Sequence, residues 1–227
     1  MAHHSSDARL SDDVLGIRQT YDLVAADYDA QLGDELRDKP LDRALLQALA
    51  ELAADGTLAD VGCGPGHVSA FLADHHPDVI GLDLSPQMID LARRRRPRQR
   101  FAVADMRALP AGDGEWAGIA ALYSIIHLTR PQRAQAFTEF RRTLRPGGRV
   151  LLAFHVEDAL HRPGEVNRLT TWFGRDVDID GHFLDPQVVT EELRSVGLAV
   201  TAQLLRAADP IVEYPSRRAY LLARAPG

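Results

Sequence analysis

The residues whose types and spacing point most directly to chemistry form a short glycine-rich loop. The stretch Asp60-Val61-Gly62-Cys63-Gly64-Pro65-Gly66 follows an apolar run and precedes a helical pattern, and glycines there let the backbone turn tightly and approach a ligand. The spacing G-x-G-x-G differs from the dinucleotide pattern G-x-G-x-x-G, because His67 stands where that pattern has its last glycine. Asp60 would repel a pyrophosphate but attract an ammonium group. The loop therefore predicts a ligand other than a dinucleotide, with a ligand-free turn as the alternative.

Two carboxylates follow the next two expected strands. Asp83 comes about twenty residues after the first glycine, where a carboxylate can accept hydrogen bonds from the hydroxyls of a ribose. Asp105, in Ala104-Asp105-Met106, could accept the amino hydrogens of an adenine. The alternatives are a helix cap at Asp83, ahead of Ser85, and a turn-forming role for Asp105.

Two histidines follow later strands and are candidates for proton transfer. His127 lies just past Tyr123-Ser124-Ile125-Ile126, and His155 ends the next strand, so both should lie at the carboxyl edge of the sheet, where ligands bind in such folds. An unperturbed imidazole pKa of about 6.5 suits proton removal near neutral pH. We expect His127 to act as a base or to orient the acceptor, with His155 as the alternative base. The competing interpretation is that each histidine merely caps a neighbouring element.

Alternating apolar runs and helical stretches must position these residues. Strands are expected at 58–61, 79–82, 101–104, 116–123 and 150–154, separated by helices at 66–74, after Ser85 and at 129–144. Continuously apolar strands that alternate with helices predict a parallel sheet with helices on both faces. Apolar stripes over 14–28 and 41–52 predict two further helices before the first strand.

The regular pattern fails between residues 156 and 185. This stretch is polar, with Trp172 and Phe173 as isolated aromatic residues, and we expect a partly helical lid there. Trp172 and His182 are candidate substrate contacts in the lid, and packing is the favoured alternative for Trp172. A helix over 185–197 and closing strands over 198–205 and 219–223 complete the chain.

The expected organisation is a single domain over 11–227, preceded by a disordered or tag-like segment over 1–10. The domain divides into N-terminal helices over 11–56, a cofactor-binding core over 57–155, the lid over 156–185, and a C-terminal helix with closing strands over 186–227. Adjacent His75 and His76 do not face one another on a helix, and no metal site is expected.

Composition and charge narrow the class of partner. The formal net charge is −6, and an acidic surface repels phosphate backbones, so nucleic acid is not expected as a partner. The single cysteine, Cys63, cannot form a disulfide within the chain, and no apolar run approaches the length of a membrane span. We therefore expect a cytoplasmic protein without a membrane partner. The only lysine, Lys39, is taken as compositional bias without a role.

Four motifs together resemble the class I S-adenosylmethionine-dependent methyltransferases of the small-molecule type. The motifs are the segment 58–66 with its glycine loop, Gly81-Leu82-Asp83-Leu84-Ser85, Ala104-Asp105-Met106 and Leu144-Arg145-Pro146-Gly147-Gly148. The resemblance implies a doubly wound, Rossmann-like α/β sheet of seven strands, mostly parallel with an antiparallel last strand, and an N-terminal helical cap. It implies S-adenosylmethionine as cofactor and S-adenosylhomocysteine as product.

The resemblance also implies which residues hold the cofactor. The loop glycines would contact its methionine part, Asp83 the ribose and Asp105 the adenine amino group. Two methionines would pack on or beside the adenine, and two tyrosines of a YDxxAxxYD stretch would belong to a closing segment. The full set of expected cofactor contacts is Tyr21, Tyr28, Asp60, Gly62, Cys63, Gly64, Gly66, Asp83, Leu84, Met88, Asp105, Met106 and Tyr123.

The expected function is transfer of a methyl group from S-adenosylmethionine to an oxygen or nitrogen of a small organic acceptor. The sulfonium already activates the methyl group, so the protein has mainly to align the acceptor and exclude water. An RNA methyltransferase is disfavoured by the acidic charge and by the absence of an N-P-P-[YF] loop after the fourth strand. A nicotinamide-dependent oxidoreductase is disfavoured by the glycine spacing. A non-catalytic protein that binds the same cofactor stays open, and a turnover assay would separate it from an enzyme.

Overall fold

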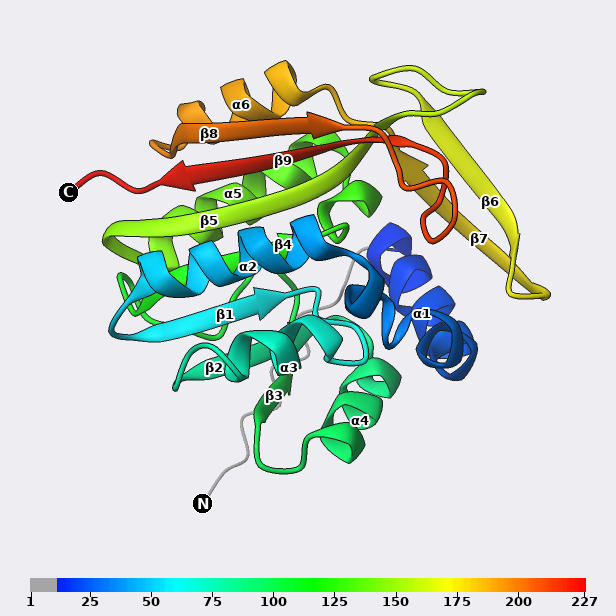
Figure 1. Cartoon of the computed structure of the whole chain (residues 1–227). Helices are drawn as coiled ribbons and strands as arrows, with labels where there is room; N and C mark the ends of the chain where they lie inside the picture. The colour runs from blue at the N-terminus through cyan, green and yellow to red at the C-terminus, as the bar shows by residue number, and fades with distance from the viewer. Residues whose placement is uncertain (1–11) are drawn as a thin grey trace.

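A seven-stranded sheet forms the centre of the computed structural model, which describes residues 12–227 (Figure 1). The expected segment 1–10 lies outside the described residues. The strands follow the order β3-β2-β1-β4-β5-β9-β8. Their bounds are β1 Thr57–Val61, β2 Val79–Asp83, β3 Arg100–Val103, β4 Trp116–Leu122, β5 Leu144–Glu157, β8 Ala199–Arg206 and β9 Arg217–Arg224. Strands β1 to β5 are parallel, and the last strand, β9, is antiparallel to β5 and β8, which confirms the expected sheet.

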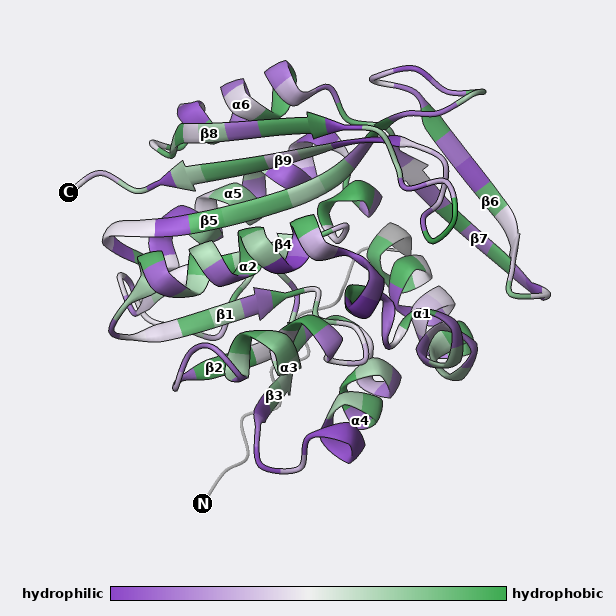
Figure 2. Ribbon diagram, viewed as in Figure 1, coloured by the Kyte–Doolittle hydropathy of each residue, from purple (hydrophilic) through white to green (hydrophobic). Residues whose placement is uncertain are grey.

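Helices cover both faces of this sheet, as the apolar strands predict (Figure 1). The helices α2 (Pro40–Ala53) and α3 (His67–Ala73) pack on one face, and α5 (Arg130–Thr143) and α6 (Pro186–Ser195) on the other. Successive side chains of β4 alternate between the two cores, because Ile119 packs with Phe137 and Ala120 packs with Leu46. The hydropathy colouring shows the resulting apolar central strands (Figure 2). No helix from residue 12 onward is long and apolar enough to cross a membrane.

Local capping signals fix where the helices begin. The Ser85 side chain accepts a hydrogen bond from the backbone N–H of Met88 at 3.1 Å and starts α4 (Pro86–Arg95). Thr129 and Gln132 form the predicted capping box at the start of α5. These caps lie just past the carboxyl ends of the strands. Each helix that they start therefore carries the chain away from that edge of the sheet.

Two elements stand outside the sheet at its carboxyl edge. Helix α1 (Asp12–Leu32) packs against α4 and against a separate two-stranded sheet, β6 (Val166–Trp172) with β7 (Arg175–His182) (Figure 1). The short helix η1 (Glu35–Asp38) then leads into α2. Together, α1 and the β6–β7 hairpin border the edge where the predicted site residues gather.

The insertion after β5 is present as expected, but its expected helical content over 156–185 is wrong, because this segment forms the β6–β7 hairpin. Val177 and Ile179 alternate with aspartates in β7, which is the period of a strand. Phe173 and Gly174 both have positive φ, 50° and 74°, and form the two-residue turn that suits a hairpin. The apolar residues are few, so the period-two signal is weak beside the polar residues around it.

Candidate active site

The glycine loop joins β1 to α3, and its three glycines have φ values of 79°, 53° and 86° at Gly62, Gly64 and Gly66. A Cβ added at Gly62 would lie 2.2 Å from the Cβ of Ser124, and a Cβ at Gly66 would lie 2.9 Å from that of Ala92. A Cβ at Gly64 would meet only a Tyr28 ring carbon, at 4.0 Å. Gly62 and Gly66 are therefore required by close packing, whereas Gly64 faces the open site.

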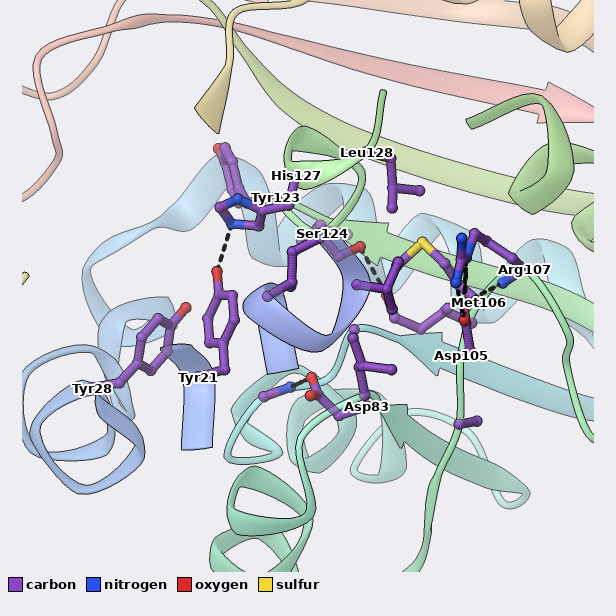
Figure 3. A pocket seen from close by; sticks show the side chains of 18 residues that line it. Tyr21, Tyr28, Asp83, Asp105, Met106, Arg107, Tyr123, Ser124, His127 and Leu128 are labelled. Atoms are coloured by element: carbon purple, nitrogen blue, oxygen red, sulfur yellow. Dashed lines mark hydrogen bonds and ion pairs between the residues drawn. The ribbon is translucent and has the colours of Figure 1, made fainter. Parts of the chain in front are cut away.

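Asp83 ends β2 and is partly buried next to this loop (Figure 3). One carboxylate oxygen accepts a hydrogen bond from the Gly64 N–H at 2.8 Å, and the other accepts one from the Ser85 N–H at 2.8 Å. Burial nevertheless raises the pKa of Asp83 to about 6. An ionised Asp83 thus keeps unused lone pairs at a partly buried position, which is suited to ligand hydroxyls.

Asp105 and Met106 follow β3 and line the same cavity as Asp83 (Figure 3). The Asp105 carboxylate accepts hydrogen bonds from Nε and Nη2 of Arg107 at 3.0 and 2.7 Å. Arg107 also lines this cavity and was not predicted from the sequence. Met88 is fully buried and does not line the cavity, so of the two expected methionines only Met106 lies beside it.

Two cavities that share seven lining residues adjoin one another along the carboxyl edge and together form the candidate site. The smaller, of about 90 Å³, contains Asp83, Leu84 and Asp105, and the larger, of about 490 Å³, contains Asp60 and Cys63. Both are lined by Tyr21, Tyr28, Gly62, Gly64, Leu122, Tyr123 and His127. Apart from Gly66 and Met88, every residue expected to contact the cofactor therefore lines this site.

Asp60 lies at the inner wall of the larger cavity. It is 1% exposed, accepts a hydrogen bond from the Ser69 hydroxyl at 2.6 Å, and has its pKa raised to about 6, chiefly by burial. A buried carboxylate that is costly to ionise gains from a nearby ligand cation. That Asp60 attracts the ammonium group of a ligand stays a prediction.

A buried charge cluster beside Asp60 was missed by the sequence analysis. The Lys39 ammonium lies 2.5 Å from a Glu35 oxygen, and His67 Nε2 lies 3.4 Å from the other Glu35 oxygen. Burial opposes ionisation of Glu35, but these two partners outweigh it and lower the Glu35 pKa to about 2. All three side chains line the larger cavity. Because Lys39 is 7% exposed, its interpretation as compositional bias without a role is not supported by its position.

His127 lies in the short helix η2 (Ile125–His127), and both of its ring nitrogens are engaged. Its Nδ1–H donates to the carbonyl oxygen of Asp180 at 2.7 Å, which leaves Nε2 to accept a hydrogen bond from the Tyr21 hydroxyl at 2.7 Å (Figure 3). Burial lowers the pKa of His127 to about 4, so the ring is neutral near pH 7. His127 therefore links α1 to the β6–β7 hairpin through its two hydrogen bonds.

His155 lies deeper in the larger cavity, on β5. Its ring packs on that of Tyr123 with centroids 5.0 Å apart, and its Nδ1 is 2.6 Å from the Ser216 hydroxyl. Burial, followed by the positive charges of Arg218 and Lys39, lowers the pKa of His155 to about 3. Tyr123 itself has a φ of 54°, and such left-handed residues other than glycine cluster at functional sites.

The two candidate substrate contacts of the hairpin also reach the larger cavity. Trp172 meets the rings of Tyr21 and Tyr28 edge-on, at 5.5 and 5.8 Å between centroids, and stacks on Phe173 at 5.0 Å. His182 is half-buried and lines the cavity from the other end of the hairpin, where it pairs with Val166. Trp172 thus both packs against α1 and presents an aromatic wall to the site.

Comparison with known proteins connects this geometry to a family. Residues 58–148 match the family model described as a methyltransferase domain. The chain is 31% identical over 212 residues to a malonyl-[acyl-carrier protein] O-methyltransferase of Dechloromonas aromatica, covering 80% of this chain and 76% of that protein. It is 31% identical over 150 residues to a demethylmenaquinone methyltransferase of Beutenbergia cavernae, covering 64% of this chain but only 60% of that relative.

A solved structure shows the same fold over nearly the whole chain. The complex of DhpI with SAH superposes with a TM-score of 0.70 at 20% identity, covering 94% of this chain and 98% of that one. The family match spans the glycine loop, Asp83 and Asp105, and the Dechloromonas relative aligns with 80% of this chain. The chain therefore belongs to the class I S-adenosylmethionine-dependent methyltransferases.

Proposed function

We propose that this chain transfers a methyl group from S-adenosylmethionine to an oxygen or nitrogen of a small organic acceptor. The observation that carries the proposal is the pair of adjoining cavities with shared lining residues. The smaller one holds the carboxylates expected for ribose and adenine, and the larger one extends past Tyr21 and Tyr123 with room for a second molecule. The Dechloromonas relative is named as an O-methyltransferase, which supports an oxygen acceptor.

The residues of the site fit the proposed cofactor. Asp83 offers partly buried carboxylate lone pairs for the ribose, and Asp105 lies beside Met106 where the adenine would bind. Asp60, costly to ionise without a cation nearby, fits the ammonium group, and the open position at Gly64 leaves room for the methionine backbone. S-adenosylmethionine supplies a methyl group that its positive sulfur already activates.

Positioning is the main contribution that we propose for the protein. Helix α1 and the β6–β7 hairpin cover the site, and the contacts of Trp172 with Tyr21 and Tyr28 close it against water. His127 holds the Tyr21 hydroxyl in place through a hydrogen bond. Since both nitrogens of His127 are engaged, the geometry favours an orienting role over that of a free base.

Label transfer tests the proposed function directly. Incubation with methyl-labelled S-adenosylmethionine and a fractionated metabolite extract should place label in a small molecule, and in neither RNA nor the protein. The Asp83→Ala variant is the negative control for label transfer, because it keeps the larger cavity but loses the ribose contact. Label in RNA alone would favour an RNA methyltransferase, and cofactor binding without any transfer would favour a non-catalytic binding protein.

The role of His127 is distinguished by two substitutions. We expect His127→Ala to lower the methylation rate about 10²-fold, because a displaced Tyr21 misaligns the acceptor. His127→Gln should recover most of that loss, since an amide can donate to the Asp180 carbonyl and accept from the Tyr21 hydroxyl. Rates and their pH profiles would be measured with the labelled acceptor. If the glutamine variant were as slow as the alanine variant, by about 10²–10⁴-fold, His127 would be acting as a base.

A further inference from the structure

Two buried cations line the larger cavity beyond Tyr123. Arg218, on β9, is 2% exposed, and Lys39, at the start of α2, is 7% exposed. The Arg218 guanidinium and the Lys39 ammonium each lie 5.6 Å from the centre of the Tyr123 ring. Because Tyr123 also lines the smaller cavity, the two cations stand next to the junction where cofactor and acceptor would meet.

The Arg218 guanidinium has a hydrogen-bond donor that no neighbouring residue in the described chain accepts. It forms an ion pair with Glu213, and its Nη2 donates to the Tyr214 carbonyl at 2.8 Å. Its Nε is buried and has no hydrogen-bond partner among residues 12–227. Glu213 does not depend on Arg218 alone, because it also accepts hydrogen bonds from Arg206 at 2.6 and 2.7 Å. A buried donor without a partner is costly, so a ligand that accepts from Arg218 binds favourably.

The unpartnered Arg218 Nε and the Lys39 ammonium, which also pairs with Glu35, are donors suited to a carboxylate. We infer that the methyl acceptor is a small organic acid, and that Arg218 and Lys39 hold the carboxylate that receives the methyl group. The inference rests on the proposed function and narrows it to one class of acceptor.

The reaction then balances without a proton transfer. A carboxylate oxygen attacks the methyl carbon, the carbon–sulfur bond breaks, and its electron pair stays on sulfur. The products are a methyl ester and the neutral thioether S-adenosylhomocysteine. A carboxylate is already ionised near neutral pH and needs no base. This agrees with a site in which His127 and His155 are neutral and already hydrogen-bonded.

The first test is the chemical nature of the labelled product from the metabolite extract. A methyl ester releases its label as methanol in mild alkali, and its parent acid should be methylated while the primary amide of that acid is not. A small-molecule product whose label resists alkali would overturn the inference and leave the proposed function intact. Absence of any labelled small molecule would instead count against the proposed function.

The second test separates the acceptor from the cofactor. Arg218→Met should raise the KM of the acid, and its Kd by calorimetry in the presence of S-adenosylhomocysteine, about 10- to 100-fold. Affinity for S-adenosylhomocysteine should stay unchanged. Arg217→Met is the matched control, because Arg217 is the neighbouring residue, 51% exposed and paired with Glu157 at the surface.

Arg218→Lys keeps the charge and provides the comparison if the methionine variant does not fold. It should bind the acid more tightly than the methionine variant and less tightly than the native chain, since it loses the planar fork. Weaker binding of S-adenosylhomocysteine, with binding of the acid unchanged, would show that these cations hold the cofactor's own carboxylate and would overturn the inference.

Discussion

Asp83→Asn should weaken binding of S-adenosylmethionine by about 10²–10⁴-fold, because two hydrogen bonds from ribose hydroxyls to a charged acceptor are each worth about 1.5–3 kcal/mol. The amide also cannot accept both the Gly64 and Ser85 N–H groups that Asp83 now satisfies. Calorimetry measures the change. Asp22→Asn is the control, because Asp22 lies close to Asp83 but contacts Ser85 and Gln87 outside the cavity lining. Unchanged affinity in the Asp83 variant would remove Asp83 from the ribose role.

The affinity for S-adenosylmethionine measured in the same experiment should also depend on pH. Asp83 and Asp60 each have a pKa raised to about 6, chiefly by burial, and the cofactor should bind their ionised forms. Affinity should therefore fall as the pH drops below 6, by up to about tenfold per pH unit for each carboxylate, and level off above it. Asp83→Asn should remove one of the two contributions and make the profile shallower. An equally steep profile in that variant would assign the pH dependence to other groups.

Gly62→Ala should lower the free energy of unfolding by about 2–6 kcal/mol, because a left-handed backbone at a residue with a Cβ adds to a severe overlap. The added Cβ would lie 2.2 Å from the Cβ of Ser124, which is itself held by a hydrogen bond to the Val61 carbonyl. Denaturant or thermal unfolding without cofactor measures the loss, at about 2–4 °C per kcal/mol for a chain of this size.

Gly174→Ala is the control that measures the effect of backbone strain without steric overlap. Gly174 has a similar φ of 74°, but nothing lies within 4 Å of an added Cβ there. Gly174→Ala should therefore lower the free energy of unfolding by only about 1–2 kcal/mol. Equal losses in the two variants would mean that Ser124 moves aside at little cost, and that the loop glycine is needed for its backbone conformation alone.

The sheet and the cofactor end of the site could be predicted because their signals are local in the chain. The glycine loop, Asp83 and Asp105 each follow a buried apolar strand, and the sheet edge brings the ends of such strands together. The caps at Ser85 and Thr129 are likewise local signals of helix starts. Side-chain direction is not visible in such patterns. Met88, on the helix after Asp83, was therefore expected at the adenine, whereas the structure buries it away from the cavity.

The larger cavity was harder to predict because its residues come from distant segments. Glu35 and Lys39 precede the first strand, whereas Glu213 and Arg218 lie near the C-terminus, and no spacing in the sequence connects the two pairs. Each ion pair is local in the chain, but only tertiary packing brings the two pairs to one cavity. The one available signal was the rarity of Lys39, the only lysine in the chain. The hairpin was missed because polar residues dilute the alternation that marks its strands.

The hairpin shares no ladder with the central sheet, whose seven strands pair only with one another. It is inserted between β5 and α6, anchored where the Leu184 N–H donates to the His155 carbonyl at 2.8 Å and where Asp185 caps α6. Changes in its length would therefore leave the register of every sheet strand unaltered. The hairpin wall of the larger cavity can be remodelled by insertion or replacement of this one segment, as an exchangeable module, while the smaller cavity, which no hairpin residue lines, retains its geometry.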